Sequence, residues 1–510
     1  MKLTRTADLW WKNAVVYCLD VETFHDSDGD GHGDFRGLVD RIDHLHRLGV
    51  TCLWLMPFFP SPDRDDGYDI TDFYGVDPRL GTLGDFVEFV RTARDRGMRV
   101  IADLVVNHTS DQHPWFREAR SSRDSPRRDW YVWRDQPPPG AERGVVFPDR
   151  EKSLWERDEE SGQYYLHRFY KHQPDLNVAN PRVRDEIARV MGFWMELGLS
   201  GFRVDAVPFL LEAPVQDLPD PHDYLGDLRA FLSRRDGEAV LLGEVNLPYA
   251  DTMRFFGSAD GVGDELHMCF DFVGMQQLYL SLARKDAGPL THALKERPLP
   301  PRDCHWATFV RNHDELILDK LTEPERREVF AAFGPEEDMQ LYGRGLRRRL
   351  PSMMGDERRT RMVYSLLFSL PGTPVLFYGE EVGMTEDLSQ PDRLAVRTPM
   401  WWDAVEEQRH DPDSLLAWVR LLVERYRECP ELAWGAFSMI DTTDPAVFAH
   451  RCDIDGGTVV AVHNLGDDAA EVELSGVQGA LTDVFSGAPA APRVVLEPYG
   501  CRWLRAGAGR

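Results

Sequence analysis

Three acidic residues each follow a short apolar run that is typical of a buried strand. Asp205 lies in GFRVDA, Glu244 in LLGEVN and Asp314 in FVRNHDE. Several carboxylates on apolar strands are unfavourable, because desolvation and like charges both oppose their ionisation. One such acid alone is readily explained as a helix cap or a loop carboxylate, but grouped acids are typical of functional sites. We therefore interpret the three acids as one catalytic group.

Two carboxylates that differ in protonation can cleave a glycosidic bond, because one attacks the sugar carbon while the other protonates the leaving oxygen. Arg203 lies two residues before Asp205 and shares its strand face, so its charge would hold Asp205 ionised as the nucleophile. Glu244, with Gly243 and apolar residues beside it, would stay protonated as the acid and then act as the base. Asp314 would clamp sugar hydroxyls and stabilise positive charge. A separation of about 5–5.5 Å between the first two acids would mean retention of anomeric configuration.

The elements that must position these side chains are strands and helices in alternation. Eight apolar runs are predicted strands: Val15–Val21, Val50–Met56, Arg99–Val106, Gly201–Val207, Val240–Glu244, Glu265–Phe272, Trp306–Asp314 and Pro374–Glu381. Amphipathic helices are predicted between them, so neighbouring strands should pair in parallel. Eight such units over about 430 residues favour a (β/α)8 TIM barrel, an α/β fold whose reactive groups lie where the strands end.

Two stretches depart from this alternation. After the third strand, residues 108–178 are rich in Trp, Tyr, Arg, Pro and Asp and predict an irregular, partly β insertion. From about Gly435 onward, short β-type runs separated by Gly, Asp and Pro predict an antiparallel β-sandwich. The predicted domains are residues 1–107 and 179–434 for the two parts of the catalytic barrel, 108–178 for the inserted domain and 435–510 for the sandwich.

Composition and charge exclude several classes of protein. The 510 residues are 42% hydrophobic and carry a net charge of −27, which disfavours nucleic-acid binding over a general surface. No apolar run approaches the ~18 residues of a membrane span, and a secretory signal pattern is missing. The seven cysteines contain no CxxC pair, so we expect a cytoplasmic protein without a zinc or disulfide framework. The basic run of Arg344 and Arg347–Arg349 is interpreted as a solvated helix face or an ion-pair partner.

Four strings resemble, in order, the signature regions of glycoside hydrolase family 13, the α-amylase family: DLVVNHTS, GFRVDA, GEVN and FVRNHDE. QPDLN at residues 173–177 is similar to a further signature near the end of that family's inserted domain. The resemblance covers essentially the whole chain. It implies a retaining mechanism through a covalent intermediate on Asp205, with Glu244 as acid/base and Asp314 as transition-state stabiliser. The residues that match the family's glucose-binding positions are His108, Arg203 and His313.

Within the family, SPDRDDGYDITDFYGVDP resembles the branch of trehalose synthases and exo-acting α-glucosidases, in which an Asp and a Tyr hold the terminal glucose. Spacing from Tyr68 matches that acid to Asp65, with Asp66 one register step away and a solvated acidic turn as the alternative. VRTPMWWD is similar to the VRTPMQW stretch of both enzymes. Its Arg397 matches an active-site arginine, whereas Trp401 replaces the usual Gln. The residues that resemble aromatic walls beside the terminal glucose are Phe147 and Phe169, which core packing would explain equally well.

The segment HDSDGDGHGDF, residues 25–35, predicts a metal-binding loop. Its alternating carboxylates place hard oxygen ligands on one side of a turn that glycine permits, as Ca²⁺ requires. Gly37 stands where an EF-hand has its bidentate Glu, so the loop is not an EF-hand. The resemblance implies a structural Ca²⁺ loop after the first barrel strand, with Mg²⁺ or a polar turn without a metal as alternatives. The predicted ligands are Asp26, Asp28, Asp30, the backbone carbonyl of His32, and Asp34.

Three functions fit these residues. NHTSDQHPWF, HRFYKHQPDLN and RNHDEL are similar to trehalose synthases, which implies an intramolecular transglucosylase that turns maltose into trehalose inside a closed pocket. The alternative is a hydrolytic, exo-acting α-glucosidase, in which water reaches the same intermediate. A non-catalytic barrel protein is the third reading, and the intact acids argue against it. The expected partner is a small oligosaccharide such as maltose, with homo-oligomer formation left open.

Overall fold

A computed structural model describes residues 9–211, 220–257, 262–474 and 476–507 of the chain. Its centre is a closed barrel of parallel strands in the order β1-β14-β10-β9-β8-β7-β3-β2. The strands are β1 (Val16–Leu19), β2 (Cys52–Leu55), β3 (Arg99–Leu104), β7 (Gly201–Val204), β8 (Val240–Gly243), β9 (Met268–Phe270), β10 (His305–Phe309) and β14 (Thr373–Phe377). All eight predicted strands are present, each shorter than its predicted run, which confirms the (β/α)8 fold.

The barrel strands are apolar because both of their faces are covered. Every residue of β1, β2, β7 and β8 is buried, as expected between a barrel interior and an outer layer of helices. β7 begins at Gly201, where a Cβ atom would lie 2.2 Å from the carbonyl oxygen of Val240, so only glycine lets β7 and β8 approach this closely. The register pairs Val204 with Gly243, and the chain positions that follow these two residues are Asp205 and Glu244. The pairing thus brings two of the predicted acids to the same level at the carboxyl end of the barrel.

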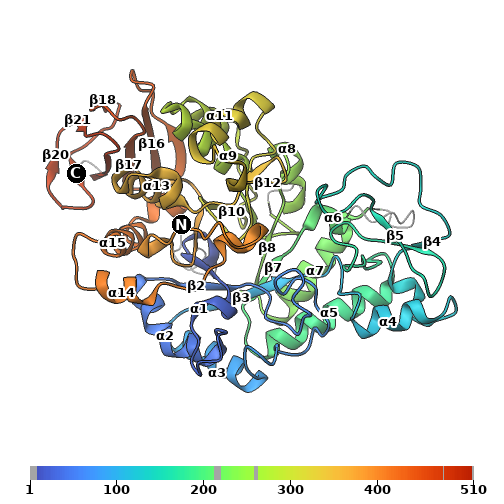
Figure 1. Ribbon diagram of the computed structural model, residues 1–510. Helices are drawn as coiled ribbons and strands as arrows, with labels where there is room; N and C mark the ends of the chain where they lie inside the picture. Colours follow the sequence, from blue (N-terminus) through green and yellow to red (C-terminus); the bar gives the residue numbers. More distant parts are fainter. Residues whose placement is uncertain (1–8, 212–219, 258–261, 475, 508–510) are drawn as a thin grey trace.

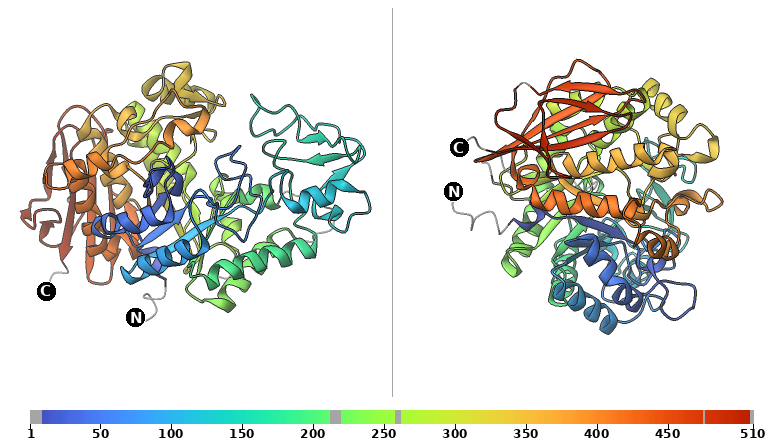
Figure 2. Two further views of the ribbon diagram at one scale, coloured as in Figure 1. Left: turned by 60° about the horizontal axis from the view of Figure 1, so that its bottom comes forward. Right: turned by 90° about the vertical axis from the view of Figure 1, so that its left-hand side faces the viewer.

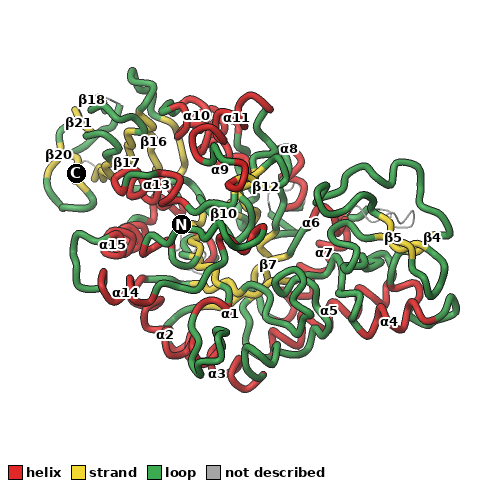
Figure 3. Tube along the Cα trace, viewed as in Figure 1, coloured by secondary structure: helices red, strands yellow, loops and turns green. Residues whose placement is uncertain are grey.

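Helices, drawn red in Figure 3, connect the strands and cover the barrel. The longer helices are α2 (Phe35–Leu48), α3 (Leu83–Asp95), α5 (Pro181–Glu196), α7 (His222–Arg235), α9 (Phe272–Arg284), α10 (Gly288–Glu296), α11 (Glu323–Phe333), α13 (Glu357–Ser369) and α15 (Leu415–Glu428). The shorter ones are α1 (Val21–Phe24), α6 (Val207–Leu211), α8 (Tyr249–Thr252), α12 (Leu350–Met354), α14 (Trp402–Gln408) and α16 (Pro430–Trp434). Side chains fix several helix starts: Thr82 and Asp85 form a capping box at α3. Within the described residues, no helix has the length and apolar character to cross a membrane.

Between β3 and β7 the chain leaves the barrel and forms a three-stranded antiparallel sheet in the order β4-β6-β5. Its elements are α4 (Pro114–Ser121), β4 (Trp133–Arg134), β5 (Trp155–Arg157) and β6 (Tyr164–Leu166). Aromatic packing holds it together, since the ring of Phe116 stacks on Trp133 with centroids 5.6 Å apart. Figure 1 and Figure 2 show this part projecting from the barrel on the side opposite the C-terminal strands. The partly β character of the insertion agrees with the sequence pattern, while the domain boundaries stay a prediction.

The C-terminal part consists of a six-stranded antiparallel sheet, in the order β15-β16-β17-β22-β19-β20, and a two-stranded sheet, β18-β21. The strands are β15 (Ala436–Met439), β16 (Val447–Ile454), β17 (Gly457–Asn464), β18 (Ala470–Glu473), β19 (Leu481–Asp483), β20 (Pro489–Ala490), β21 (Arg493–Leu496) and β22 (Cys501–Gly507). Val460, Leu496 and Leu504 belong to the apolar layer that the two sheets share. The larger sheet also contacts the barrel, because Nε1 of Trp503 donates to Oγ of Ser365 on α13 at 3.0 Å.

Candidate active site

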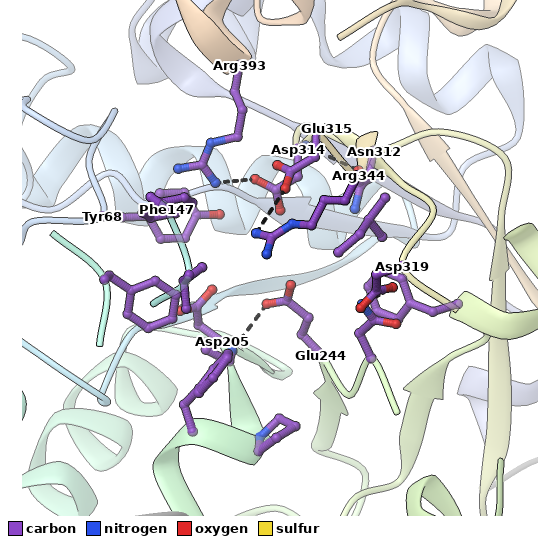
Figure 4. Close-up of a pocket in the computed structure, with 18 of the residues that line it drawn as sticks. Tyr68, Phe147, Asp205, Glu244, Asn312, Asp314, Glu315, Asp319, Arg344 and Arg393 are labelled. Carbon is purple, nitrogen blue, oxygen red and sulfur yellow. Dashed lines mark hydrogen bonds and ion pairs between the residues drawn. The ribbon is translucent and has the colours of Figure 1, made fainter. Parts of the chain in front are cut away.

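A cavity of about 420 Å³ lies at the carboxyl end of the barrel strands (Figure 4). Its size lies within the ~300–1,000 Å³ that is usual for sites of small molecules. The three acids predicted from the sequence all line it. Figure 4 shows Asp205 and Glu244 on one side of the cavity, with Asp314 and Arg393 facing them from the other. The barrel therefore gathers the predicted catalytic group at one place.

One buried arginine holds three carboxylates together beneath this cavity. Nη1 of Arg203 on β7 contacts Asp103 of β3 and donates to Oδ1 of Asp205 at 2.5 Å. Nη2 of Arg203 donates to Oε2 of Glu244 at 2.5 Å. Asp103 also accepts a hydrogen bond of 2.8 Å from Nε1 of Trp54. One positive charge among three acids leaves an excess of negative charge, which favours keeping a proton on one of them.

Burial shifts the pKa values of all three acids upward. Burial raises the pKa of Glu244 to about 7, although the charge of Arg203 opposes the shift. Burial raises the pKa of Asp205 and of Asp103 to about 6, again against Arg203. The group therefore keeps a proton up to a higher pH than exposed carboxylates would. One protonated and one ionised acid are what retaining glycoside cleavage requires.

A sharp turn between β7 and α6 fixes the relation of these two acids. Ala206 has a φ of 46°, in the left-handed region that residues other than glycine rarely adopt. Its backbone N–H donates to Oε2 of Glu244 at 3.2 Å. Strain of this kind persists only where the surrounding structure holds it in place. Here it connects the residue after Asp205 directly to Glu244.

The third acid, Asp314, is held by a separate set of charges. Its Oδ1 accepts hydrogen bonds from Nη1 of Arg393 at 2.6 Å and from Nη2 of Arg397 at 3.1 Å. Its Oδ2 lies 3.3 Å from Nε2 of His313. Burial opposes ionisation, but His313 and the two guanidinium groups outweigh it and hold the pKa of Asp314 well below its usual range. Asp314 is therefore the acid that stays ionised throughout, able to stabilise positive charge.

The neighbouring residues Asp65 and Asp66 lie on different sides of the active-site wall. Asp65 lines the cavity, and its carboxylate accepts hydrogen bonds of 2.8 Å from Nη2 of Arg393 and from Nε2 of Gln173. Asp66 does not line it, and its Oδ2 instead accepts a hydrogen bond of 2.5 Å from Nη1 of Arg397. Asp65 is thus the acid that can reach a bound ligand.

Family models match the chain over both of its main parts. Residues 20–327 match the alpha amylase catalytic domain, and residues 456–505 match a sucrose hydrolase-like C-terminal domain. The chain belongs to the α-amylase family of glycoside hydrolases.

The curated relatives include trehalose synthases and, at lower identity, α-glucosidases such as a glucan 1,6-alpha-glucosidase from Streptococcus pneumoniae, 31% identical over 96% of this chain and 98% of its own length. A trehalose synthase from Thermus thermophilus is 41% identical over 96% of this chain and 55% of its own length. A trehalose synthase from Pimelobacter sp. (strain R48) is 38% identical over 97% of this chain and 96% of its own. The chain therefore spans about half of the Thermus enzyme and almost all of the Pimelobacter enzyme. Among solved structures, the alpha-glucosyl transfer enzyme XgtA is 27% identical with a TM-score of 0.79, over 98% of this chain and 99% of that one. The chain is thus an α-amylase-family enzyme that is similar to trehalose synthases.

The predicted residues of this α-amylase-family site lie in two layers. Those that line the cavity, besides the three acids, are Asp65, Tyr68, His108, Phe147 and Phe169. Arg203, His313 and Arg397 do not line it but lie buried behind it and contact its carboxylates. Nε2 of His313 also lies 2.7 Å from the hydroxyl of Tyr68, and the two rings stack. These three residues therefore position the groups that a ligand would meet.

Sequence reasoning missed Arg393, which bridges Asp65 and Asp314 across the cavity. It lies in η7 (Asp392–Val396), a short helical segment after β14. The guanidinium group of Arg393 lies 5.4 Å from the ring centroid of Phe147. The preceding residue, Asp392, pairs with Arg150 of the inserted segment at 2.7 Å. The only signal in the sequence was the position of Arg393 four residues before Arg397 in DRLAVR.

The interpretation of the basic run as a helix face is wrong, because Arg344 and Arg347–Arg349 precede α12 instead of lying within a helix. The ion-pair alternative holds for Arg344, which lines the cavity with an Nη2 3.6 Å from Oε1 of Glu315. Arg349 is fully buried and donates to the backbone carbonyls of Tyr378 and Val396. Through these hydrogen bonds the run holds neighbouring loops together at the carboxyl end of the barrel.

The predicted metal loop brings three of its acids together. One carboxylate oxygen each of Asp26, Asp28 and Asp34 lies within 4.8 Å of the other two. Backbone N–H groups of the loop lower the pKa of Asp26, which keeps it ionised. Asp30 is not part of this group, and its carboxylate accepts a hydrogen bond of 2.8 Å from the backbone N–H of His32. Three converging carboxylates are a donor set that fits Ca²⁺.

Trp401, which replaces a Gln of the family's motif, does not line the active-site cavity. It lines a separate groove together with Asp66 and Arg397. The substitution therefore leaves the lining of the catalytic pocket unchanged.

Proposed function

We propose that this enzyme converts maltose into trehalose by transferring a glucosyl group within one pocket. The observation that carries the proposal is that Asp205 and Glu244 share the single guanidinium group of Arg203. This pair sits in a cavity whose far wall holds an ionised Asp314. Similarity to trehalose synthases at about 40% identity supports transfer over hydrolysis.

In the first step, the carboxylate of Asp205 attacks the anomeric carbon of the non-reducing glucose of maltose. The bond from this carbon to the bridging oxygen breaks, and Glu244 gives its proton to that oxygen. The products are a glucosyl ester on Asp205 and free glucose. Asp314 stabilises the positive charge that develops on the sugar ring, because it is held ionised in a buried site.

In the second step, the released glucose turns in the pocket and presents its anomeric hydroxyl to the glucosyl ester. Glu244, now ionised, takes the proton of this hydroxyl while its oxygen forms the new bond to the anomeric carbon. The ester bond to Asp205 breaks, which releases trehalose and restores both acids. Hydrolysis differs only in that water takes the place of glucose.

Retention of glucose depends on how the pocket is covered. The ion pair of Arg150 and Asp392 connects the inserted segment to η7, and Arg393 of η7 lies over Phe147. At the opposite rim, Nδ2 of Asn246 donates to Oδ1 of Asp319 at 3.1 Å. These contacts join segments around the pocket, and we propose that they help to retain glucose for transfer. A hydrolytic α-glucosidase is the second candidate, because it would use the same acids.

Incubation with maltose in the presence of isotope-labelled free glucose tests the proposal. Trehalose should be the main product and should carry no label, because the acceptor never leaves the pocket. Glucose as the only product would make the enzyme a hydrolytic α-glucosidase. Labelled trehalose would show transfer to an outside acceptor, and an unchanged substrate would exclude maltose.

We further propose a structural Ca²⁺ held by Asp26, Asp28 and Asp34. When bound, the ion would offset most of the charge of the three neighbouring carboxylates and hold the loop between α1 and α2 in one conformation. Asp34 already accepts a hydrogen bond of 2.7 Å from the backbone N–H of Gly37 and so caps α2. The cytoplasmic location and any homo-oligomer stay predictions.

A further inference from the structure

An open groove of about 1030 Å³ lies beside the active site, and Trp401 lines it. Its other walls come from the start of α1, the loop that carries Asp63 and Asp66, and the chain between β14 and α14. None of its lining residues also lines the catalytic cavity. The groove is therefore a separate space, and neither step of the proposed reaction uses it.

The groove exposes large apolar side chains that the fold does not require at the surface. Trp401 is 41% exposed and Leu394 is 37% exposed, two of the seven large hydrophobic side chains exposed in the described part of the chain. The neighbouring Trp402 behaves differently: its Nε1 donates to the carbonyl of Phe24 at 2.6 Å, and its ring packs against Arg41. An exposed indole beside a hollow is typical of a binding surface.

Polar groups of the groove offer acceptors to a neutral ligand. Asp63, Asp66 and Asp403 line it, and ionised carboxylates accept hydrogen bonds from hydroxyl groups. The acids disfavour an anionic ligand by charge. Glu22, Asp63 and Asp66 lie close enough together to share a cation. Arg79, however, pairs with Glu22 at 3.3 Å and with Asp63 at 2.9 Å, and Arg397 pairs with Asp66 at 2.5 Å, so these guanidinium charges already offset the acids and disfavour a metal ion. The chemistry that remains is a molecule with many hydroxyl groups and an apolar face.

We infer that this groove is a second saccharide site, in which an α-linked glucose unit stacks on the indole of Trp401 and its hydroxyl groups bind the acids opposite. A pyranose ring has the required apolar face and hydroxyl edge. The choice of maltose as the probe rests on the proposed function, whereas the site itself does not take part in that reaction.

The two saccharide sites share one wall. Arg397 donates through Nη1 to Asp66, which lines the groove, and through Nη2 to Asp314, which lines the catalytic cavity. The adjacent residue Asp65 faces the cavity. A sugar bound to Asp66 thus lies next to the arginine that holds a catalytic acid, which gives the groove a physical route to affect the reaction.

Calorimetric titration of maltose into the Asp205→Asn enzyme tests the inference, because this background should bind maltose without converting it. Two binding sites are expected. Adding Trp401→Gln, which restores the residue of the family motif, should weaken one site at least tenfold, equal to about 1.4 kcal/mol, and leave the other unchanged. Leu299→Gln is the matched control, since Leu299 is 86% exposed and lies outside the groove.

Trp401→Gln in the otherwise native enzyme should leave the turnover of dilute maltose within about twofold, since the residue lies outside the catalytic cavity. If the Asp205→Asn enzyme has a single maltose site that Trp401→Gln does not affect, the groove is not a saccharide site, whereas the proposed function stays intact. Two sites that both survive Trp401→Gln would overturn the assignment to Trp401. The absence of any maltose binding would overturn both proposals together.

Discussion

Replacing Arg393 by Met should damage catalysis while the protein still folds. Arg393 donates hydrogen bonds to Asp314 at 2.6 Å and to Asp65 at 2.8 Å, and its side chain is 15% exposed. These bonds set the positions of two acids that line the cavity. Without them both carboxylates would gain freedom and Asp314 would lose one of its two guanidinium partners.

The expected loss of kcat/KM follows from the hydrogen bonds that Asp314 and Asp65 each keep. A hydrogen bond to a charged group contributes about 1.5–3 kcal/mol when one partner is removed. Asp314 would keep Arg397 at 3.1 Å and Asp65 would keep Gln173 at 2.8 Å, so the lower end applies to each. The sum, about 3 kcal/mol, predicts a fall in kcat/KM of about 150-fold. Arg393→Lys keeps the charge but not the two-armed geometry, and should lose about tenfold.

Steady-state kinetics on maltose, with circular dichroism and a melting curve for each variant, measures these effects. Arg150→Met is the matched control, because Arg150 pairs with the adjacent Asp392 but is 52% exposed. An exposed pair contributes about 0–1 kcal/mol, so this variant should lose less than about fivefold. The reasoning is refuted if Arg393→Met loses no more than Arg150→Met, or if Arg393→Lys and Arg393→Met lose equal amounts.

Three further outcomes are expected. The profile of kcat/KM should fall below pH about 6, where Asp205 takes up a proton, and above pH about 7, where Glu244 loses its own. The alkaline fall should vanish for a substrate whose leaving group needs no acid, and an unchanged profile would contradict the role of Glu244. Asp205→Asn should abolish turnover with an unchanged melting curve, whereas substantial residual activity would exclude Asp205 as the nucleophile. Removing Ca²⁺ with a chelator should lower the melting temperature, and Asp28→Asn should abolish this response; equal melting of the native enzyme with and without Ca²⁺ would contradict the metal site.

The barrel and its catalytic acids can be predicted from the sequence, because both depend on the periodicity of strands and on where the strands end. Asp205, Glu244 and Asp314 could be placed together because parallel strands of a barrel end at one face. Arg393 could not be found this way, since it lies on a short helical segment after the last barrel strand and reaches the site only through loop packing. The set of metal ligands stays a prediction, because alternation along a loop does not report which carboxylates converge, and only Asp26, Asp28 and Asp34 do so in the structure.

The same limit explains Arg349 and Trp401. A run of arginines is usually solvated, but Arg349 is buried because backbone carbonyls of two loops satisfy its guanidinium group. Trp401 was recognised as a departure from a motif, yet only the structure places it on the groove side of Arg397. Contacts that a buried side chain makes with segments far away in the sequence leave no periodic pattern, so they cannot be predicted from it.

The order of strands in the C-terminal sheet has a consequence for how the protein folds during its synthesis on the ribosome. β22 lies in the interior of the six-stranded sheet, between β17 and β19, although it is the last strand in the chain order. Until residue 507 has been synthesised, β17 and β19 both present unpaired edges, and Ser365 of the barrel lacks its contact with Trp503. Truncation before β22 would therefore open the sheet at its middle, leaving an aggregation-prone chain with an otherwise completed catalytic barrel.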